Sequence, residues 1–301
     1  MDGVPFTRRE AQAAGLDRLS LESMIATGAV HRVFRGMYLD GLLRDDLRAR
    51  VLAVSRILPP GAAVSRRTAA WLRGVDARAP AELDADGPAD LECTVDVEVE
   101  PLRRPGLRCF VAPLTGDVEE YLGVPITSAV RTTIDLLRWS PPHLALGAAD
   151  ALAHAGWVTP EAVQADLERW EGRRGVVQAR RLAGLMEPAT ESFGESWLRL
   201  RVVDAGFPRP RVQIPVLVAG KSYRLDLGWE DVWAAAEYDG QEHHSSPEQI
   251  RHDEARRASL ERAGWRILVA GRGEVLGSGL RLERAIGELL GQEPRIYRRA
   301  W

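Results

Sequence analysis

The pattern of apolar and polar residues near the N-terminus predicts two short helices and a small β-hairpin. Thr7 followed by Glu10 has the form of a capping box, so a first helix should begin there. Ser20 is placed to cap a second helix, which Gly28 should end. The run VHRVFRGMYL alternates around a central Arg-Gly, as two strands joined by a tight turn would. This order of elements predicts a winged helix-turn-helix.

The last third of the chain predicts a helix, three strands and a closing helix. In the run ESFGESWLRLRVVDAGF, the residues Glu195, Leu198 and Val202 share one face at helical spacing, so an acid lies on the apolar face. Apolar runs with polar interruptions then predict two strands joined by a tight turn, a core strand and a final helix, over residues 223–229, 232–240, 265–270 and 281–290. A mixed α/β unit is therefore expected at this end.

Length and charge divide the chain into parts. A chain of 301 residues, 45% of them apolar, is too long for one small core and suggests two or three units. An acidic run with Pro and Gly at residues 76–90 is typical of a linker, and a second boundary lies near the Glu-Pro at residue 187. We therefore expect units at residues 1–75, 76–189 and 190–301.

Several classes of protein are excluded by composition. The net charge of −3 excludes a uniformly basic nucleic-acid coat, although residues 1–75 carry twelve basic and seven acidic side chains. Two cysteines without CxxC spacing exclude a disulfide scaffold and a zinc site built on them. No apolar leader and no run near the ~20 apolar residues of a membrane span occurs. We expect a cytoplasmic protein with no membrane partner.

The basic residues of the N-terminal part lie on the expected hairpin. A winged helix-turn-helix usually places its second helix in the DNA major groove. That helix, at residues 21–27, contains no arginine, whereas His31, Arg32 and Arg35 lie on the hairpin. We therefore expect Arg32 and Arg35 to contact DNA phosphates rather than bases. A protein-docking module is the alternative.

The first 185 residues resemble AbiEi-type antitoxins. The resemblance lies in residues 7–39, in VSRRTAAWLRG at residues 64–74 and in GVPITSAVRTTIDLLR at residues 123–138. It implies a DNA-binding transcriptional regulator of a two-gene toxin–antitoxin system, with a toxin or another protein as partner. Residues 76–189 show no chemistry of their own and are interpreted as an AbiEi-like scaffold.

Two acids on the expected C-terminal hairpin point to a metal. A turn centred between Asp231 and Val232 places Asp226 directly opposite Glu237, with Cα atoms about 4.5–5.5 Å apart. Two carboxylates at ~5 Å repel by about 3 kcal/mol at an effective dielectric constant of ~20, so either a cation bridges them or one is protonated. Mg²⁺, with Mn²⁺ as the alternative ion, suits such ligands. The structural alternative is a pair of solvated acids on a half-exposed hairpin.

Further polar residues could complete this site. Glu195 can supply a third acid if its helix packs against the hairpin, and Asp239 shares the face of Glu237. His243 follows the EYDG turn and has a side-chain pKa suited to general acid or base catalysis. The alternative for His243 is an exposed loop position.

The arginines after this turn have two interpretations. Asp253 and Arg257 are four residues apart and can form a surface ion pair on a helix. Alternatively Arg251, Arg256 or Arg257 faces the cleft and clamps a phosphate through two hydrogen bonds. We assign Arg257 to nucleic-acid binding.

The C-terminal acid pattern resembles the PD-(D/E)XK nuclease superfamily, and in detail its very-short-patch-repair (Vsr-like) branch. The resemblance lies in four blocks, at residues 194–207, 223–229, 235–243 and 252–270. It implies that Asp226 and Glu237 hold the metal, that Glu195 completes the site and that His243 lies beside the scissile phosphate. The superfamily lysine, which orients the attacking water and neutralises the phosphate, is replaced by Asp239.

The expected protein is thus of mixed α+β class. It has an N-terminal winged helix-turn-helix with a helical extension and a C-terminal restriction-endonuclease-like α/β domain with a mixed sheet. The expected function is a metal-dependent endonuclease that hydrolyses DNA phosphodiester bonds, with Glu195, Asp226, Glu237, Asp239 and His243 as catalytic residues. The alternative is an antitoxin-like DNA-binding regulator with a non-catalytic nuclease-like domain, and RNA remains open as the substrate.

Overall fold

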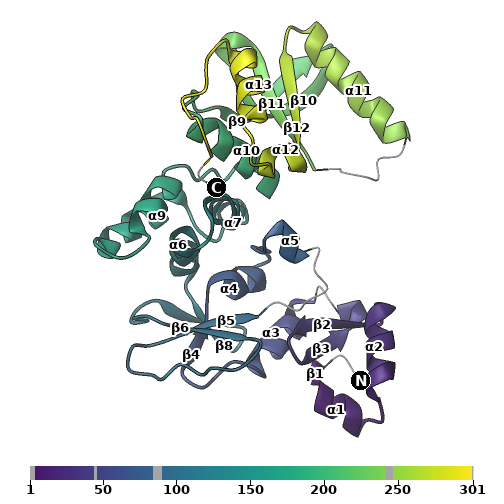
Figure 1. Cartoon of the computed structure of the whole chain (residues 1–301), viewed down its shortest axis with the longest axis vertical. Helices are drawn as coiled ribbons and strands as arrows, with labels where there is room; N and C mark the ends of the chain where they lie inside the picture. The colour runs from purple at the N-terminus through teal and green to yellow at the C-terminus, as the bar shows by residue number, and fades with distance from the viewer. Residues whose placement is uncertain (1–3, 44–45, 84–89, 241–246, 300) are drawn as a thin grey trace. The chain divides into compact units, whose positions relative to one another are not determined.

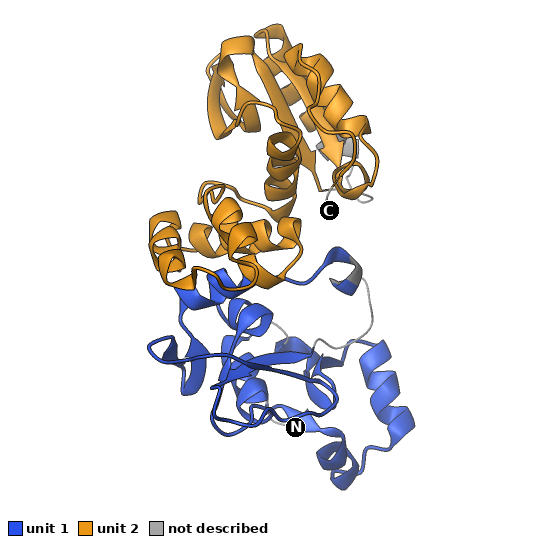
Figure 2. Ribbon diagram, turned by 60° about the vertical axis from the view of Figure 1, so that its left-hand side comes forward, with its two compact units in different colours: residues 1–136 blue, residues 137–301 orange. Residues whose placement is uncertain are grey.

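The chain forms two compact units, residues 1–136 and 137–301 (Figure 1, Figure 2). The structure is a computed structural model that describes residues 4–43, 46–83, 90–240, 247–299 and 301. The division falls inside helix α6 (Ala129–Trp139). It therefore differs from the three parts expected at residues 75 and 189.

The first unit begins with two helices and a hairpin. Helices α1 (Arg8–Ala13) and α2 (Arg18–Ala26) precede strands β2 (Val30–Phe34) and β3 (Met37–Asp40), and a short strand β1 (Phe6–Thr7) completes a sheet of order β1-β3-β2. The helix, helix and hairpin order predicted for this region is confirmed.

The caps of these two helices show one correct prediction and one error. The capping box is present, because the Thr7 N–H donates to Glu10 Oε2 at 2.7 Å and the Glu10 N–H donates to Thr7 Oγ1 at 3.3 Å. The second cap was wrong: α2 begins at Arg18, and the side chain of Asp17 accepts a hydrogen bond from the Ser20 N–H at 2.7 Å. Aspartate is among the strongest N-cap residues, so the helix extends back to it.

A five-stranded sheet fills the rest of the first unit. Its order is β6-β5-β4-β8-β7, and the elements of this part are η1 (Gly41–Leu43), α3 (Leu47–Ser55), β4 (Ala62–Val64), α4 (Arg66–Leu72), α5 (Pro80–Leu83), β5 (Leu91–Val95), β6 (Leu107–Val111), β7 (Val118–Tyr121) and β8 (Val124–Thr127). Strand β4 pairs with β5, so one sheet spans the boundary expected at residue 75. Helix α5 also lies within the run expected to be a linker. Strands β4 and β5 are only three and five residues long and lie far apart in the sequence, so no local pattern indicates that they pair across this boundary.

The second unit combines a helical layer with a four-stranded mixed sheet. The helical elements are α7 (Pro142–His154), α8 (Pro160–Asp166), η2 (Leu167–Trp170), α9 (Val176–Ala183) and α10 (Phe193–Asp204). The sheet has the order β12-β11-β10-β9, with β9 (Arg211–Val218), β10 (Lys221–Trp229), β11 (Ala234–Asp239) and β12 (Arg266–Gly271). The turn η3 (Glu230–Val232) and helices α11 (Pro247–Arg262), α12 (Arg272–Leu276) and α13 (Arg281–Leu290) complete the unit. Because β11 and β12 are parallel and the other pairs antiparallel, the expected mixed α+β class is confirmed.

Helix α10 is the element common to the helical layer and the sheet. On one side a buried ion pair joins it to α7, since Arg199 Nη2 donates to Asp150 Oδ2 at 2.5 Å. On the other side Arg201 forms a buried ion pair with Glu283 of α13. Packing across the boundary expected at residue 189 therefore makes residues 137–301 one compact unit.

Helix α11 covers one side of the sheet, and α10 and α13 lie on the other side (Figure 1). The core beneath α11 contains Ile214, Leu225, Ala235, Leu260 and Trp265, all less than a tenth exposed. Among the described residues, no helical segment combines the length and the apolar composition that a membrane span requires.

Candidate functional site

The two hairpin acids lie side by side where the β10–β11 ladder ends. The register pairs Trp229 with Ala234 and Leu227 with Ala236, which brings Asp226 and Glu237 to the next position. This is the opposition predicted from the turn centre. The Tyr238 N–H donates to Asp226 Oδ2 at 2.9 Å and holds that carboxylate against β11. The hairpin register, a local feature of the chain, therefore brings these two acids together.

The third acid, Glu195, reaches this region from the first turn of α10. Ser192 caps the helix and accepts a hydrogen bond from the Glu195 N–H at 3.2 Å. Glu195 Oε2 accepts hydrogen bonds from the Glu191 N–H at 3.1 Å and from Gln213 Nε2 at 2.8 Å. The side chain is 7% exposed, so the fold brings a buried carboxylate from a separate element into the field of the hairpin acids.

A glycine permits this close approach of α10 and β11. A Cβ at Gly194 would lie 2.0 Å from Cε1 of the Tyr238 ring. Real Cβ atoms do not come so close to a neighbouring ring, so any other residue at this position would move the helix or the ring. Gly194 therefore sets the position of the following residue, Glu195, relative to the strand.

The electrostatics of the three acids centre on Asp226. Burial raises the pKa of Asp226 to about 7, and the negative charges of Glu195 and Glu237 also raise it. The Tyr238 N–H and the positive charge of Arg256 lower the pKa of this group but do not cancel these effects. The Asp226 carboxyl can thus gain or lose a proton close to neutral pH, as expected for an acid with too little positive charge around it.

Arg256 of α11 forms the one ion pair of Glu237 among the described residues. Its Nη1 donates to Glu237 Oε2 at 2.9 Å and its Nη2 donates to Oε1 at 2.7 Å, a bidentate arrangement. Nη2 also donates to the backbone carbonyl of Arg224 at 2.6 Å. The sequence indicates that one of three arginines faces the cleft as a phosphate clamp, with Arg257 assigned to nucleic-acid binding, and it does not predict an ion pair with Glu237. The structure places Arg256 at the acids, with Arg257 beside it on α11.

Gln213 is a site residue that the sequence did not reveal. Its neighbours Val212 and Ile214 pair with Leu227 and Leu225, so Gln213 lies across from Asp226 in the β9–β10 register. Its φ of +50° lies in the left-handed region, which costs a residue with a Cβ roughly 1–2 kcal/mol. A strained residue whose amide binds Glu195 is typical of a functional site. The one available signal was a polar residue within the apolar run RVQIPV.

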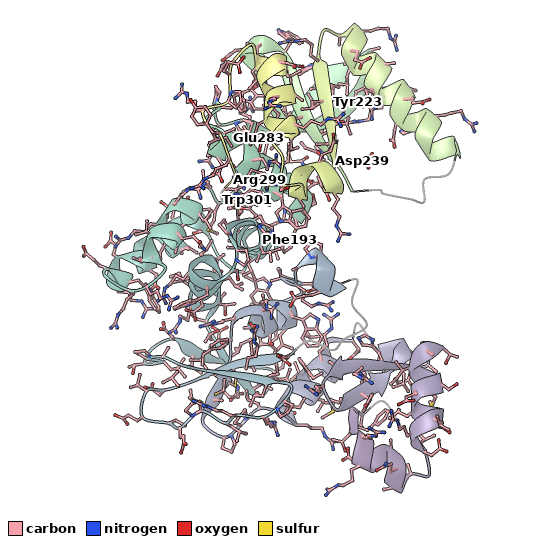
Figure 3. The ribbon with its side chains drawn as sticks, in the orientation of Figure 1. Phe193, Tyr223, Asp239, Glu283, Arg299 and Trp301 are labelled. Carbon is pink, nitrogen blue, oxygen red and sulfur yellow. The ribbon has the colours of Figure 1, made fainter. Side chains whose placement is uncertain are left out.

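Two other expected site residues are less well defined. Asp239, labelled in Figure 3, closes β11 and is exposed, two residues beyond Glu237. His243 lies outside the described residues. The structure therefore brings together Glu195, Asp226 and Glu237 of the five expected catalytic residues.

The donor set suits a small hard cation held by two carboxylates. Asp226 Oδ2 is used by the Tyr238 N–H, whereas Oδ1 has no hydrogen-bond partner among the described residues. Mg²⁺ prefers oxygen ligands and is commonly held by one or two carboxylates together with waters. Over the described ranges, no three Asp, Glu, His or Cys side chains form a ready cluster of metal ligands. An ion at this site would therefore rest on Asp226 and on Glu237, whose two oxygens also accept hydrogen bonds from Arg256, with Glu195 adding negative charge.

The two expected DNA-contacting arginines of the first unit differ in accessibility. Arg32 is half-buried, with its guanidinium carbon 5.6 Å from the centre of the Tyr38 ring. Arg35 is exposed at the turn between β2 and β3. Arg35 is therefore the better placed of the two to contact a phosphate.

Comparison with known proteins identifies relatives but no family. No family model matches the chain. The chain is 28% identical over 255 residues to uncharacterized protein Rv2248 of Mycobacterium tuberculosis (strain ATCC 25618 / H37Rv). The matched region covers 84% of this chain and 89% of that protein. Uncharacterized protein MT2308 of Mycobacterium tuberculosis (strain CDC 1551 / Oshkosh) matches to the same extent. Because 255 residues exceed the length of either compact unit, the similarity extends over both units.

Proposed function

We propose that the second unit is a metal-dependent endonuclease that hydrolyses DNA phosphodiester bonds. The observation that carries this proposal is the juxtaposition of Asp226 and Glu237 where the ladder between two adjacent strands ends, with Glu195 close enough to raise the pKa of Asp226. A mixed sheet with helices on both sides is compatible with the restriction-endonuclease-like fold that the sequence resemblance implies. Surplus negative charge in a partly buried site favours a bound cation over a purely structural role.

Each site residue has a defined task in this proposal. Asp226 and Glu237 would hold Mg²⁺ or Mn²⁺, and Glu195 would complete the negative field. When bound there, the ion would supply a Lewis acid for the phosphate oxygens and a water of lowered pKa. Tyr238 fixes Asp226 through its N–H, and Gln213 fixes Glu195 through its amide. In this proposal His243 would transfer a proton, and Asp239 would stand where the superfamily has its lysine.

The reaction balances without a further reactant. A water oxygen forms a bond to phosphorus, and the bond between phosphorus and one sugar oxygen breaks. The attacking water gives up one proton, and the departing sugar oxygen takes up one. Stabilising the charge on the phosphate and orienting the water are therefore the two tasks left to the protein.

A cleavage assay with matched variants tests this proposal. The purified chain is incubated with supercoiled plasmid, single-stranded DNA and structured RNA, each with Mg²⁺, Mn²⁺ or EDTA. We expect metal-dependent cleavage of DNA that is lost in Asp226→Ala and in Glu237→Ala. Asp231→Ala, which removes an exposed acid from the turn of the same hairpin, should cleave normally. Cleavage that persists in both site variants would contradict the assignment.

A second candidate function is a DNA-binding regulator, which is favoured by the N-terminal elements. Two helices followed by a hairpin with the exposed Arg35 at its turn suit binding to a DNA backbone. Under this alternative the second unit would serve as a binding platform, with a toxin or another protein as partner. Salt-sensitive binding to promoter DNA that Arg35→Gln weakens and Asp226→Ala leaves unchanged, without cleavage of any substrate, would favour the regulator.

A further inference from the structure

We infer that Arg256 is the residue of this site that binds the substrate phosphate. The inference rests on the proposed function and names the substrate group that the site recognises, a nucleic-acid phosphodiester. It starts from the charge balance of the site. Three carboxylates, those of Glu195, Asp226 and Glu237, face one guanidinium, and position 239 carries another acid.

The fold holds the guanidinium of Arg256 in a defined place. Leu260, one helical turn further along α11, is fully buried in the core beneath that helix. Residues four apart lie on the same face of a helix, so the anchoring of Leu260 directs Arg256 toward the sheet. Two bonds to Glu237 and one to the Arg224 carbonyl then fix the orientation of the planar group.

The guanidinium retains donors for a ligand. Arginine has five N–H groups, of which Nη2 uses two and Nη1 uses one in these contacts. The Nε–H and the second Nη1–H have no partner within the described residues. The side chain is 25% exposed, so these donors can meet a ligand from solvent. Arginine donors of this kind match phosphate oxygens better than any other side chain does.

A purely structural role explains less of this arrangement. Glu237 is buried, and a buried ion pair gains little over well-packed neutral residues, so packing alone does not require this pair of charges. An anionic phosphate, by contrast, could approach three carboxylates only where a cation offsets their charge. Arg256 supplies that cation at the carboxylate expected to hold the metal.

Substitution of Arg256 should affect metal binding and DNA binding differently if Arg256 binds phosphate, and similarly if its role is only structural. We measure Mn²⁺ affinity by titration, duplex DNA affinity by fluorescence anisotropy in Ca²⁺ and in EDTA, and cleavage in Mg²⁺, for wild type and Arg256→Gln. We expect wild type to bind DNA more tightly in Ca²⁺ than in EDTA. In Arg256→Gln this gain in affinity should be about tenfold smaller, the size expected for the loss of one charge-assisted hydrogen bond. The kcat/KM for cleavage should fall at least as far. Mn²⁺ affinity should be unchanged or higher, because a positive charge beside a metal ligand has been removed.

Two further variants control for charge and folding. Arg256→Lys keeps the charge but loses the fork, so its DNA affinity and kcat/KM should lie between those of wild type and Arg256→Gln. Arg262→Gln removes the same charge from the same helix at a side chain that bonds to Ala258 and Ser259, and it should leave DNA and Mn²⁺ affinity unchanged. Equal losses in Arg256→Gln and Arg262→Gln would reduce the effect to overall charge and overturn the inference.

The remaining outcomes separate this inference from the proposed function. If Arg256→Gln binds Mn²⁺ and DNA equally less well and melts at lower temperature, Arg256 has only a structural role. If the Ca²⁺-dependent gain in DNA affinity is absent in wild type or unchanged in Arg256→Gln, the inference fails. If no substrate is cleaved but that gain is lost in Arg256→Gln, hydrolysis fails as the function and Arg256 stands as the phosphate-binding residue.

Discussion

Two groups of charges in the second unit, one buried around Asp150 and one partly buried around Asp226, differ in how well they are compensated. Asp150 accepts hydrogen bonds from the Glu187 N–H at 2.8 Å and from Ser196 Oγ at 2.7 Å, and it pairs with Arg199. Asp226 accepts one backbone hydrogen bond, with Glu195 and Glu237 close to it. Burial raises the pKa of both aspartates, to about 6 for Asp150 and about 7 for Asp226, but only for Asp226 do neighbouring acids add to the shift.

This difference separates a structural acid from a candidate ligand-binding acid. A buried charge with a complete set of partners joins two helices and needs nothing more. A partly buried acid beside other acids, such as Asp226, is stabilised by a proton or by an added cation. The predictions below test this contrast, ranked by the expected change in the free energy of unfolding.

The largest change is expected for Asp150→Ala. The substitution leaves the guanidinium of Arg199 buried and unpaired, and loss of one partner of a buried pair costs about 3–5 kcal/mol. Urea unfolding of the intact chain should show this loss in the transition of the second unit. The double variant Asp150→Ala/Arg199→Met should recover much of the stability. If Asp150→Ala is as stable as wild type, the pair is not the structural element we describe.

The opposite sign is expected for Asp226→Asn. The pKa of the folded group, about 7, lies above the value of about 3.9 for an unfolded aspartate, so ionisation destabilises the fold as the pH rises between these values. At pH 8 the amide should therefore raise the free energy of unfolding by on the order of 2 kcal/mol, and the gain should shrink toward pH 4. Thermal melts across this pH range measure the effect, together with the loss of metal-dependent cleavage. Lower stability at pH 8 would remove the distinction between the two acids.

A smaller gain is expected for Gln213→Gly. Glycine adopts the left-handed conformation without strain, so this variant should be about 1 kcal/mol more stable than Gln213→Ala, which loses the same hydrogen bond to Glu195 but keeps the strain. Loss of the amide that holds Glu195 should at the same time weaken Mn²⁺ binding and cleavage. Gln213→Ala keeps the strain and loses the amide, so it should show the functional loss without the gain. Equal stability of the Gly and Ala variants would show that no strain is stored there.

The smallest change is expected for an exposed pair in the first unit. Arg18 Nε and Glu22 Oε1 lie 2.7 Å apart on the surface of α2. Exposed pairs are screened by solvent, so Arg18→Gln should shift the melting temperature by less than about 1 °C. The effects of the substitutions at Asp150 and Asp226 are compared with the effect of this variant. A shift as large as that of Asp150→Ala would mean that burial is not the deciding variable.

Local patterns in the sequence predicted most of the elements that carry the site, but not strand β9, which carries Gln213. Helix α10, strands β10, β11 and β12 and helix α13 occur where periodicity placed them, because the alternation of apolar residues records which face each element buries. The opposition of Asp226 and Glu237 followed from counting outward from a turn, since a hairpin joins neighbours in the chain and fixes its own register.

The tertiary structure decided what depends on residues far apart in the chain. The division into two units required the pairing of β4 with β5 and the packing of α7 against α10, which no local pattern records. The choice of Arg256 over its neighbour Arg257 depended on how α11 rotates onto the sheet, and the role of Gln213 on a backbone conformation that only its surroundings impose. The sequence by itself thus determined which acids meet on the hairpin. Packing decided that the guanidinium of Arg256 and the amide of Gln213 bind these acids. Long-range contacts select one orientation of each element among several that the local sequence allows equally.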